Sequence, residues 1–183
     1  IERAARAVNK RYPGSVLDVG DLSLRDGGDV LRHHSHESGR DADLGFYVVD
    51  AKGKGVHGKT FTRVGADLRA ENAPGGTFDL PRNWLFIASL VTDSKATVSH
   101  IFVAAPLRDR LLAYARSKGV SQRVIDKVSL VMMQPSDSIE HDDHYHIRIS
   151  CPKAMRGTCI EMSRNAPTGA SRAEAARAKK KTL

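Results

Sequence analysis

Hydrophobic positions recur along the chain with two different spacings, and each spacing predicts a different kind of element. In residues 82–91 and 106–118 apolar side chains return every three or four positions, which is typical of helices with one buried face. Residues 44–49, 97–104 and 127–133 are short apolar runs, which favour buried strands. This mixture of helices and strands indicates an α+β fold.

Turn-forming residues set the ends of the predicted helices. Pro81 lies in the first turn of one helix, and Pro106 opens the next, which Gly119 ends. Three shorter elements are also predicted: a helix at residues 1–11, a strand at 15–20 and a helical turn at 121–126. From these elements we expect a mainly antiparallel sheet with flanking helices.

The segment at residues 50–76 is rich in glycine and predicts a long loop, with a short strand or hairpin inside it. Long ordered loops in compact domains are commonly functional. Two interpretations stay open from the sequence: the segment forms one wall of a substrate cleft, or it is a surface excursion.

Length and charge indicate one domain with a tail. The chain has 183 residues, and we expect one folded domain at 1–162 followed by a basic, flexible tail at 163–183. The formal net charge is +8, and residues 171–183 supply half of it, since five basic residues stand against one acidic residue there. The remaining body is only mildly basic, which argues against a groove for nucleic acid. No run of about 18 apolar residues predicts a transmembrane helix.

Six of the eight histidines fall into two short segments, residues 33–36 and 141–146. Residues 143–150 predict a strand, in which side chains alternate between two faces. One face would carry His144, His146, Arg148 and Ser150, and the other Tyr145, Ile147 and Ile149. The apolar face can pack on a core while both histidines point into a cleft. We expect no metal role for His57 and His100.

The first segment offers His36 and, seven residues later, Asp43. Gly39 between them permits a turn that most residues resist. A histidine before a turn and an aspartate at the start of the next strand can converge on one point. Together with His146 they supply two imidazoles and one carboxylate. Catalytic zinc sites hold the metal with three such ligands and keep a fourth position for water, so we predict a catalytic zinc ion.

These residues carry a family resemblance. The patterns His33-x-x-His36-x-x-Gly39-x-x-x-Asp43 and His141-x-x-His144-x-His146 are similar to those of the penicillin-insensitive murein endopeptidases. That family resembles the zinc peptidases typified by lysostaphin, the D-Ala-D-Ala peptidases and the hedgehog domain. The resemblance implies zinc in a cleft over one sheet face. It implies these roles: His36, Asp43 and His146 as zinc ligands, His144 and His141 as catalytic histidines, and His33 as a further histidine of the site.

The resemblance also implies a substrate. We expect a zinc endopeptidase that cleaves D-Ala–meso-diaminopimelate cross-links of peptidoglycan with metal-activated water. Two alternatives are a zinc D,D- or L,D-carboxypeptidase of the same group and a non-catalytic zinc-containing domain that binds cell wall. Arg148, on the face of the metal histidine, would bind a substrate carboxylate or form a structural ion pair. The sequence does not predict an oligomeric state.

Cys151 and Cys159 follow the second histidine segment and are separated by seven residues. The resemblance supports a disulfide between them, which implies an oxidising compartment, so we expect a periplasmic or secreted protein. Two free thiols, or one buried thiol, are the alternative.

Overall fold

The fold is described from a computed structural model of the chain, and the described residues are 1–24, 27–28, 36, 39–136, 138–155, 159 and 161. The predicted tail at 163–183 lies outside these residues. Within them the chain has four helices, a five-stranded sheet, a small two-stranded sheet and a short 3₁₀ helix, η2 (Lys153–Met155). The expected α+β class is confirmed.

The main sheet has the strand order β1–β2–β7–β5–β6. Its strands are β1 (Val19–Leu22), β2 (Asp41–Gly45), β7 (His144–Ile149), β5 (Val98–Phe102) and β6 (Met132–Met133). The first three pairings are antiparallel, but β5 and β6 run parallel. The sheet is therefore mixed, which corrects the expectation of a mainly antiparallel one. The reason is the connection: two helices lie between β5 and β6, and such a crossover is what a parallel pair requires.

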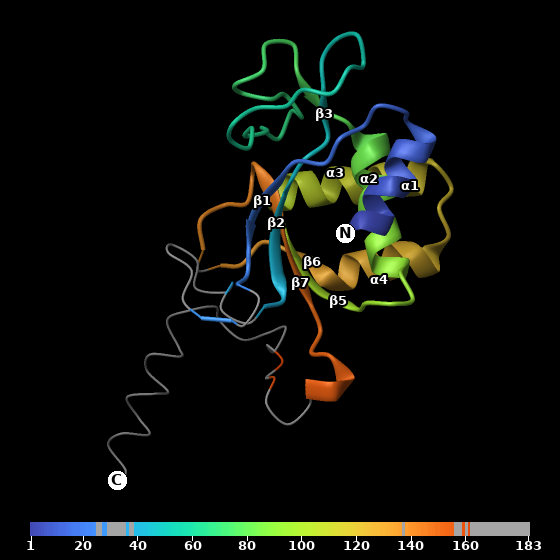
Figure 1. Ribbon diagram of the computed structural model, residues 1–183. Coiled ribbons are helices and arrows are strands. Elements are labelled where there is room, and N and C mark those ends of the chain that lie inside the picture. The colour runs from blue at the N-terminus through green and yellow to red at the C-terminus, as the bar shows by residue number, and fades with distance from the viewer. Residues whose placement is uncertain are drawn as a thin grey trace.

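The helices gather on one side of this sheet (Figure 1). They are α1 (Glu2–Arg11), α2 (Leu80–Thr92), α3 (Ala105–Ser117) and α4 (Gln122–Val131). Helix α2 begins where the sequence indicated, because the Asp79 side chain accepts a hydrogen bond from the Arg82 backbone N–H and Pro81 occupies the first turn.

Helix α4 corrects the strand predicted at residues 127–133. The buried residues of this stretch are Ile125, Val128 and Val131, which follow one another at intervals of three. Side chains three positions apart lie on one face of a helix. Ile125, which precedes the predicted strand, therefore shares a buried helix face with Val128 and Val131. Only Met132 and Met133 form a strand. A short apolar run is ambiguous between the two structures until its neighbours are included.

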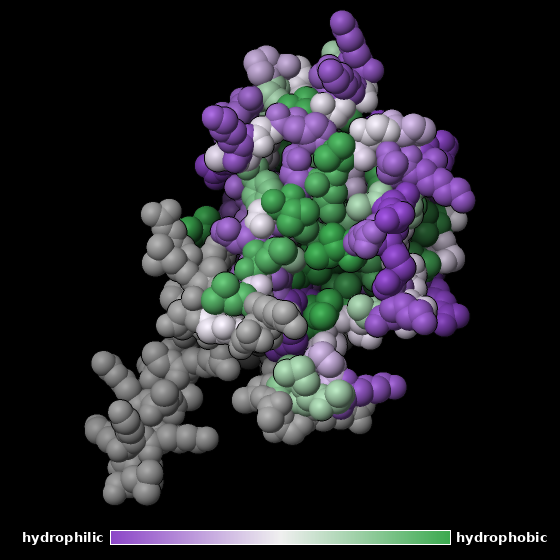
Figure 2. Space-filling model, in the orientation of Figure 1, coloured by the Kyte–Doolittle hydropathy of each residue, from purple (hydrophilic) through white to green (hydrophobic). Residues whose placement is uncertain are grey.

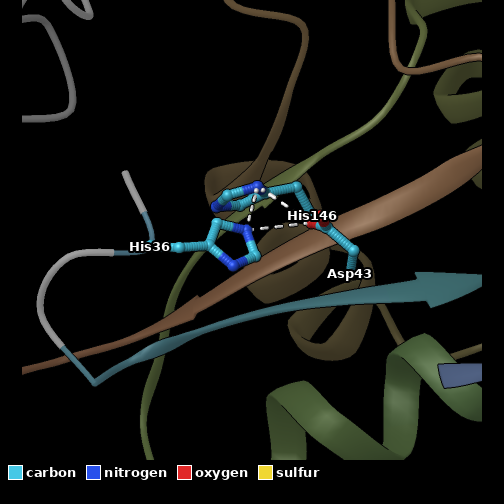
Figure 3. A group of neighbouring side chains, drawn as sticks. All are labelled: His36, Asp43 and His146. Atoms are coloured by element: carbon cyan, nitrogen blue, oxygen red, sulfur yellow. Dashed lines mark hydrogen bonds and ion pairs between the residues drawn. The ribbon is translucent and has the colours of Figure 1, made fainter. Parts of the chain in front are cut away.

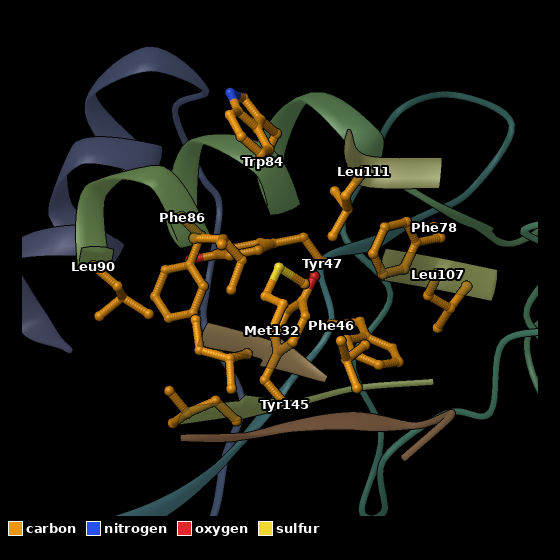
Figure 4. Packing of buried hydrophobic residues seen from close by; sticks show 14 of the residues in the cluster. Phe46, Tyr47, Phe78, Trp84, Phe86, Leu90, Leu107, Leu111, Met132 and Tyr145 are labelled. Atoms are coloured by element: carbon orange, nitrogen blue, oxygen red, sulfur yellow. The ribbon is translucent and has the colours of Figure 1, made fainter. Parts of the chain in front are cut away.

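The hydrophobic core lies between the sheet and the helices (Figure 4). Alternate residues of the three central strands enter it: Ala42, Leu44, Ile101, Tyr145 and Ile147. Tyr145 is fully buried, and its hydroxyl donates to Asn83 Oδ1 at 3.1 Å. Trp84 belongs to this core. The intervening residues of β2 and β7 face away from the helices, and they include the predicted site residues.

The segment at 50–76 is held by backbone pairing. Strand β3 (Val48–Val49) pairs with β4 (Thr77–Phe78), and isolated bridges join Val49 to Gly55, Val64 to Ala70 and Arg69 to Thr77. The Val64 N–H also donates to the Asp142 carbonyl at 2.8 Å. The segment therefore rests on the loop that leads into β7.

Strand β1 forms one edge of the main sheet, and all four of its residues are exposed. Figure 2, in the orientation of Figure 1, shows apolar side chains in the middle of the visible face. The exposed large apolar residues on and beside β1 are Val16, Val19, Leu22 and Leu24. Among the described residues, no helix has the length and apolar character needed to cross a membrane.

Candidate metal centre

The register of β2 against β7 builds the candidate site. Three cross-strand pairs share the sheet face opposite the helices: Asp41 with Arg148, Asp43 with His146, and Gly45 with His144. Because side chains alternate along each strand, the charged and imidazole groups meet on this face while the apolar residues between them enter the core. The second histidine segment therefore has the two faces that the sequence predicted, with the histidines on one face and the apolar residues on the other.

His36, Asp43 and His146 converge on one point, although His36 and His146 are 110 residues apart (Figure 3). His36 Nε2 lies 3.2 Å from Asp43 Oδ1 and 3.3 Å from His146 Nδ1, and His146 Nδ1 lies 3.1 Å from Asp43 Oδ1. The three donor atoms thus form a nearly equilateral triangle, and all three residues are buried.

This triangle has the dimensions of a tetrahedral zinc site. Zinc bonds of about 2.0–2.1 Å at tetrahedral angles separate neighbouring donor atoms by about 3.3 Å. The three observed separations, 3.1–3.3 Å, agree with that value. Two imidazole nitrogens and one carboxylate oxygen are also a donor set that zinc accepts. The residues therefore fit a zinc ion.

Asp41 and Arg148 stand behind His146. His146 Nε2 lies 2.9 Å from Asp41 Oδ1, while Arg148 donates to both oxygens of Asp41, at 2.6 and 3.0 Å. In the neutral ring, with the Nε2 proton donated to Asp41, the lone pair of His146 is at Nδ1, which is the atom in the triangle. Carboxylate partners of this kind fix the tautomer of metal-binding histidines. Arg148 is buried and forms an ion pair with Asp41.

The electrostatics of this face favour positive charge. Burial raises the pKa of Asp43, but hydrogen bonds from His144, His146 and His36 outweigh burial and leave the pKa well below its usual range. For His146 the two effects have the opposite signs. Burial lowers the pKa of its imidazole, but the hydrogen bonds to Asp41 and Asp43 outweigh burial and raise the pKa. A buried carboxylate among imidazoles therefore holds protons on them or binds a cation in their place.

His144 lies beside the triangle. Its Nδ1 is 2.5 Å from Asp143 Oδ1, and its Nε2 is 3.5 Å from Asp43 Oδ1. Burial lowers its pKa, but the hydrogen bonds to Asp143 and Asp43 outweigh burial and raise the pKa to about 9. The side chain is about 20% exposed, so solvent reaches it, whereas His36 is closed off.

His141 completes the group of histidines. Its ring centroid lies 5.3 Å from that of His144 and 6.0 Å from that of His146. Burial, and then the charges of those two histidines, lower its pKa to about 4. Its buried Nδ1 has no hydrogen-bond partner among the described residues. His141 thus presents a neutral imidazole next to His144.

Other histidines take different places. His33 lies outside the described residues. His57 lies in the glycine-rich segment, and its Nδ1 is 3.0 Å from the carboxylate oxygen Oδ1 of Asp18. His100 lies on β5 opposite Arg148 and is buried next to Ser99.

Three neighbours of the site, Asp41, Phe61 and Phe102, were not among the site residues predicted from the sequence. Phe61 stacks on His144, and the Phe102 ring lies 5.2 Å from that of His146. The alternation of β5 could have placed Phe102 on this face, but the pairing of β5 with β7 was not known from the sequence. No pattern near residue 61 indicates its neighbour.

The two cysteines form a disulfide. Cys151 Sγ and Cys159 Sγ are 2.03 Å apart, which confirms the pairing that the family resemblance supported. No described cysteine remains free.

Fold and site together define a candidate metal centre, made of buried histidine and aspartate side chains, on the open face of an α+β sheet. The chain belongs to the penicillin-insensitive murein endopeptidase family, which it matches over residues 1–181. It is thus a member of a peptidase family that acts on murein, the peptidoglycan of bacterial walls. No curated protein matches the chain.

Proposed function

We propose that this chain is a zinc endopeptidase that hydrolyses peptide cross-links of peptidoglycan, between D-Ala and meso-diaminopimelate. The observation that carries the proposal is the triangle of His36, Asp43 and His146, whose edges of 3.1–3.3 Å fit one zinc ion. Membership of the murein endopeptidase family supports the substrate class. The particular bond rests on the resemblance of the two histidine motifs to that family.

The chain would hold zinc through His36 Nε2, Asp43 Oδ1 and His146 Nδ1. When bound there, zinc supplies a Lewis acid that lowers the pKa of a bound water to about 7 and polarises the peptide carbonyl. Asp41 and Arg148 keep the His146 ring in the tautomer and orientation that this role needs.

His144 is the residue placed to move the proton. Its Nδ1 is engaged by Asp143, so the working atom is Nε2, on the side of the triangle. A cation bound at Asp43 would remove the hydrogen bond and neutralise the negative charge with which Asp43 raises the pKa of His144, so that Nε2 could lose its proton. From there His144 can take a proton from the attacking water and return it to the leaving amine, as general base and then general acid. The neutral His141 beside it can hydrogen-bond the substrate through a ring nitrogen.

A periplasmic location is part of the proposal. The Cys151–Cys159 disulfide is typical of oxidising compartments, and peptidoglycan lies in one.

The test is digestion of purified muropeptides, followed by mass spectrometry, with and without a chelator. We expect cross-linked dimers to disappear, the chelator to stop this, and zinc to restore it. His144→Ala should keep its zinc and lose about 10²- to 10⁴-fold in kcat, the usual contribution of a general acid or base. Loss of terminal D-Ala from monomers with intact dimers would make the chain a carboxypeptidase. Full activity of the zinc-free chain would contradict the metal mechanism.

A further inference from the structure

Two glycines lie in neighbouring strands of the sheet, Gly20 within β1 and Gly45 at the end of β2. Neither has a positive φ, so no turn or left-handed conformation requires a glycine at either position. A glycine in a strand weakens it, and often marks a place where another group approaches the backbone closely. The approaching group should therefore be identifiable.

That group is the ring of Phe61. A Cβ atom added at Gly20 would lie 2.5 Å from Phe61 Cζ and 2.7 Å from Cε2. One added at Gly45 would lie 3.1 Å from Phe61 Cδ1 and Cε1. The two glycines thus form a notch in the sheet surface, which we call the glycine notch, and any side chain at Gly20 would displace the ring that fills it.

The seated ring stacks on His144. The two ring centroids are 5.2 Å apart and their planes are inclined by 23°. Gly45 is the cross-strand partner of His144, so the notch and the imidazole are neighbours across β1, β2 and β7. Phe61 covers one face of the imidazole while Asp143 binds its Nδ1.

The segment that carries Phe61 is tied to the loop before His144. Arg63 donates from Nε and Nη2 to Asp142 Oδ2, at 2.9 and 2.7 Å. The Val64 N–H donates to the Asp142 carbonyl at 2.8 Å. Arg63 is two residues after Phe61, and Asp142 is two residues before His144. These hydrogen bonds therefore hold the two segments together and fix the Phe61 ring over the imidazole.

We propose that Phe61 is a positioning residue for His144, and that the glycine notch exists to seat it. The inference rests on the proposed function, because it assigns a residue to the proton transfer at His144 Nε2. A rigid ring on one face of the imidazole prevents rotation of His144 about its Cβ–Cγ bond and keeps Nε2 directed at the triangle. Misplacement of a catalytic group by about 1 Å can cost on the order of 100-fold in rate.

The experiment is a double-mutant cycle between Phe61→Leu, which removes the ring, and Gly20→Ala, which should push the ring out of the notch. Each single variant should lower kcat by roughly 10- to 100-fold, with KM and zinc content unchanged. The double variant should be no worse than Phe61→Leu alone, because the second change acts only through a ring that is already gone.

Gly55→Ala is the matched control. Its added Cβ would lie 2.8 Å from His57 Nε2, so it inserts the same methyl group against a different ring and should leave kcat unchanged. A second measurement does not need activity. In proton NMR spectra of the zinc-free chain, the ring protons of His144 should show the shift caused by a stacked aromatic ring, and both Phe61→Leu and Gly20→Ala should remove it.

Two results would overturn the proposal: kcat unchanged in Phe61→Leu although the NMR shift is lost, or additive losses in the double variant. Failure of the proposed function is a separate outcome. It would show as a wild-type chain that leaves muropeptides uncut with zinc bound, whereas the presence or absence of the NMR shift would still decide whether Phe61 holds the His144 ring.

Discussion

The two faces of β2 are both almost completely buried, but burial is favourable for the residues of one face and costly for those of the other. Leu44 is 0% exposed and Asp43, its neighbour in sequence, is 3% exposed. Leu44 enters the core beneath the helices, where burial of apolar surface is itself favourable. Asp43 is a carboxylate, and removing an ion from water costs several kcal/mol unless partners compensate it.

The difference teaches that the polar face is arranged for a purpose other than stability. Asp41 is compensated by Arg148, and Asp43 by three histidines. A buried set of charges contributes little to stability compared with apolar residues of similar size. The core face should therefore control the free energy of unfolding, and the site face should control metal binding and catalysis.

The largest effect expected on the site face is that of Asp43→Asn. The substitution keeps the volume of the side chain but removes the charge of a ligand. Loss of a metal that supplies several kcal/mol of transition-state stabilisation corresponds to a fall in kcat/KM on the order of 10³-fold or more. Muropeptide digestion measures it, and an active Asp43→Asn variant would remove Asp43 from the ligand set.

On the core face, Leu44→Ala should do the opposite. Truncation of a fully buried leucine costs about 2–5 kcal/mol of unfolding free energy, whereas kcat per folded molecule should stay the same. Urea denaturation gives the first value. Leu130→Ala is the matched control, because Leu130 is 57% exposed and its truncation should change stability by less than about 0.5 kcal/mol. Equal losses in the two variants would disprove the placement of Leu44 in the core.

Alkaline pH provides a smaller test of the core. Burial, and then the charge of Asp18, raise the pKa of Tyr47 to about 12. Because the folded pKa exceeds the unfolded value near 10, the contribution of Tyr47 is complete below about pH 10 and is lost as pH rises toward 12. At pH 11 the loss is about 1.4 kcal/mol. Unfolding free energies at pH 8 and 11 should differ less in Tyr47→Phe, and an unchanged difference would count against this shift.

On the site face, a smaller effect than that of Asp43→Asn is expected of Asp41→Asn. This carboxylate touches the triangle only through His146, and loss of such a partner typically weakens metal affinity by about 10- to 100-fold. Competition with a chelator of known affinity measures the change. Zinc affinity equal to that of the wild type would show that Asp41 serves Arg148 alone.

Much of the site could be predicted from the sequence, because alternation along β7 and the short separation of His36 and Asp43 are local features. The convergence of His36, Asp43 and His146 on one point was predicted from the residues, the family resemblance implies the same three ligands, and the distances agree with it. Asp41 and Arg148 could not be paired in advance, since their contact depends on the register of β2 against β7. Phe61 escaped notice because it arrives from a loop with no periodicity.

The fold shows a similar boundary between local and non-local information. Helices α2 and α3 carry proline and glycine signals at their ends and were predicted to within one or two residues. Helix α4 has a weaker signal: only a helical turn at 121–126 was predicted, and the residues that follow were predicted as a strand, although Val128 and Val131 share a helix face with Ile125. The parallel pairing of β5 with β6 depends on that helix, so one error led to the other.

The central claim is that His36, Asp43 and His146 share one zinc ion, and anomalous diffraction at the zinc edge from crystals grown with zinc tests it most directly. The account predicts one peak, about 2.0–2.1 Å from His36 Nε2 and His146 Nδ1 and about 2.0–2.2 Å from Asp43 Oδ1. A peak elsewhere, or no peak with the three side chains hydrogen-bonded to one another, would contradict it.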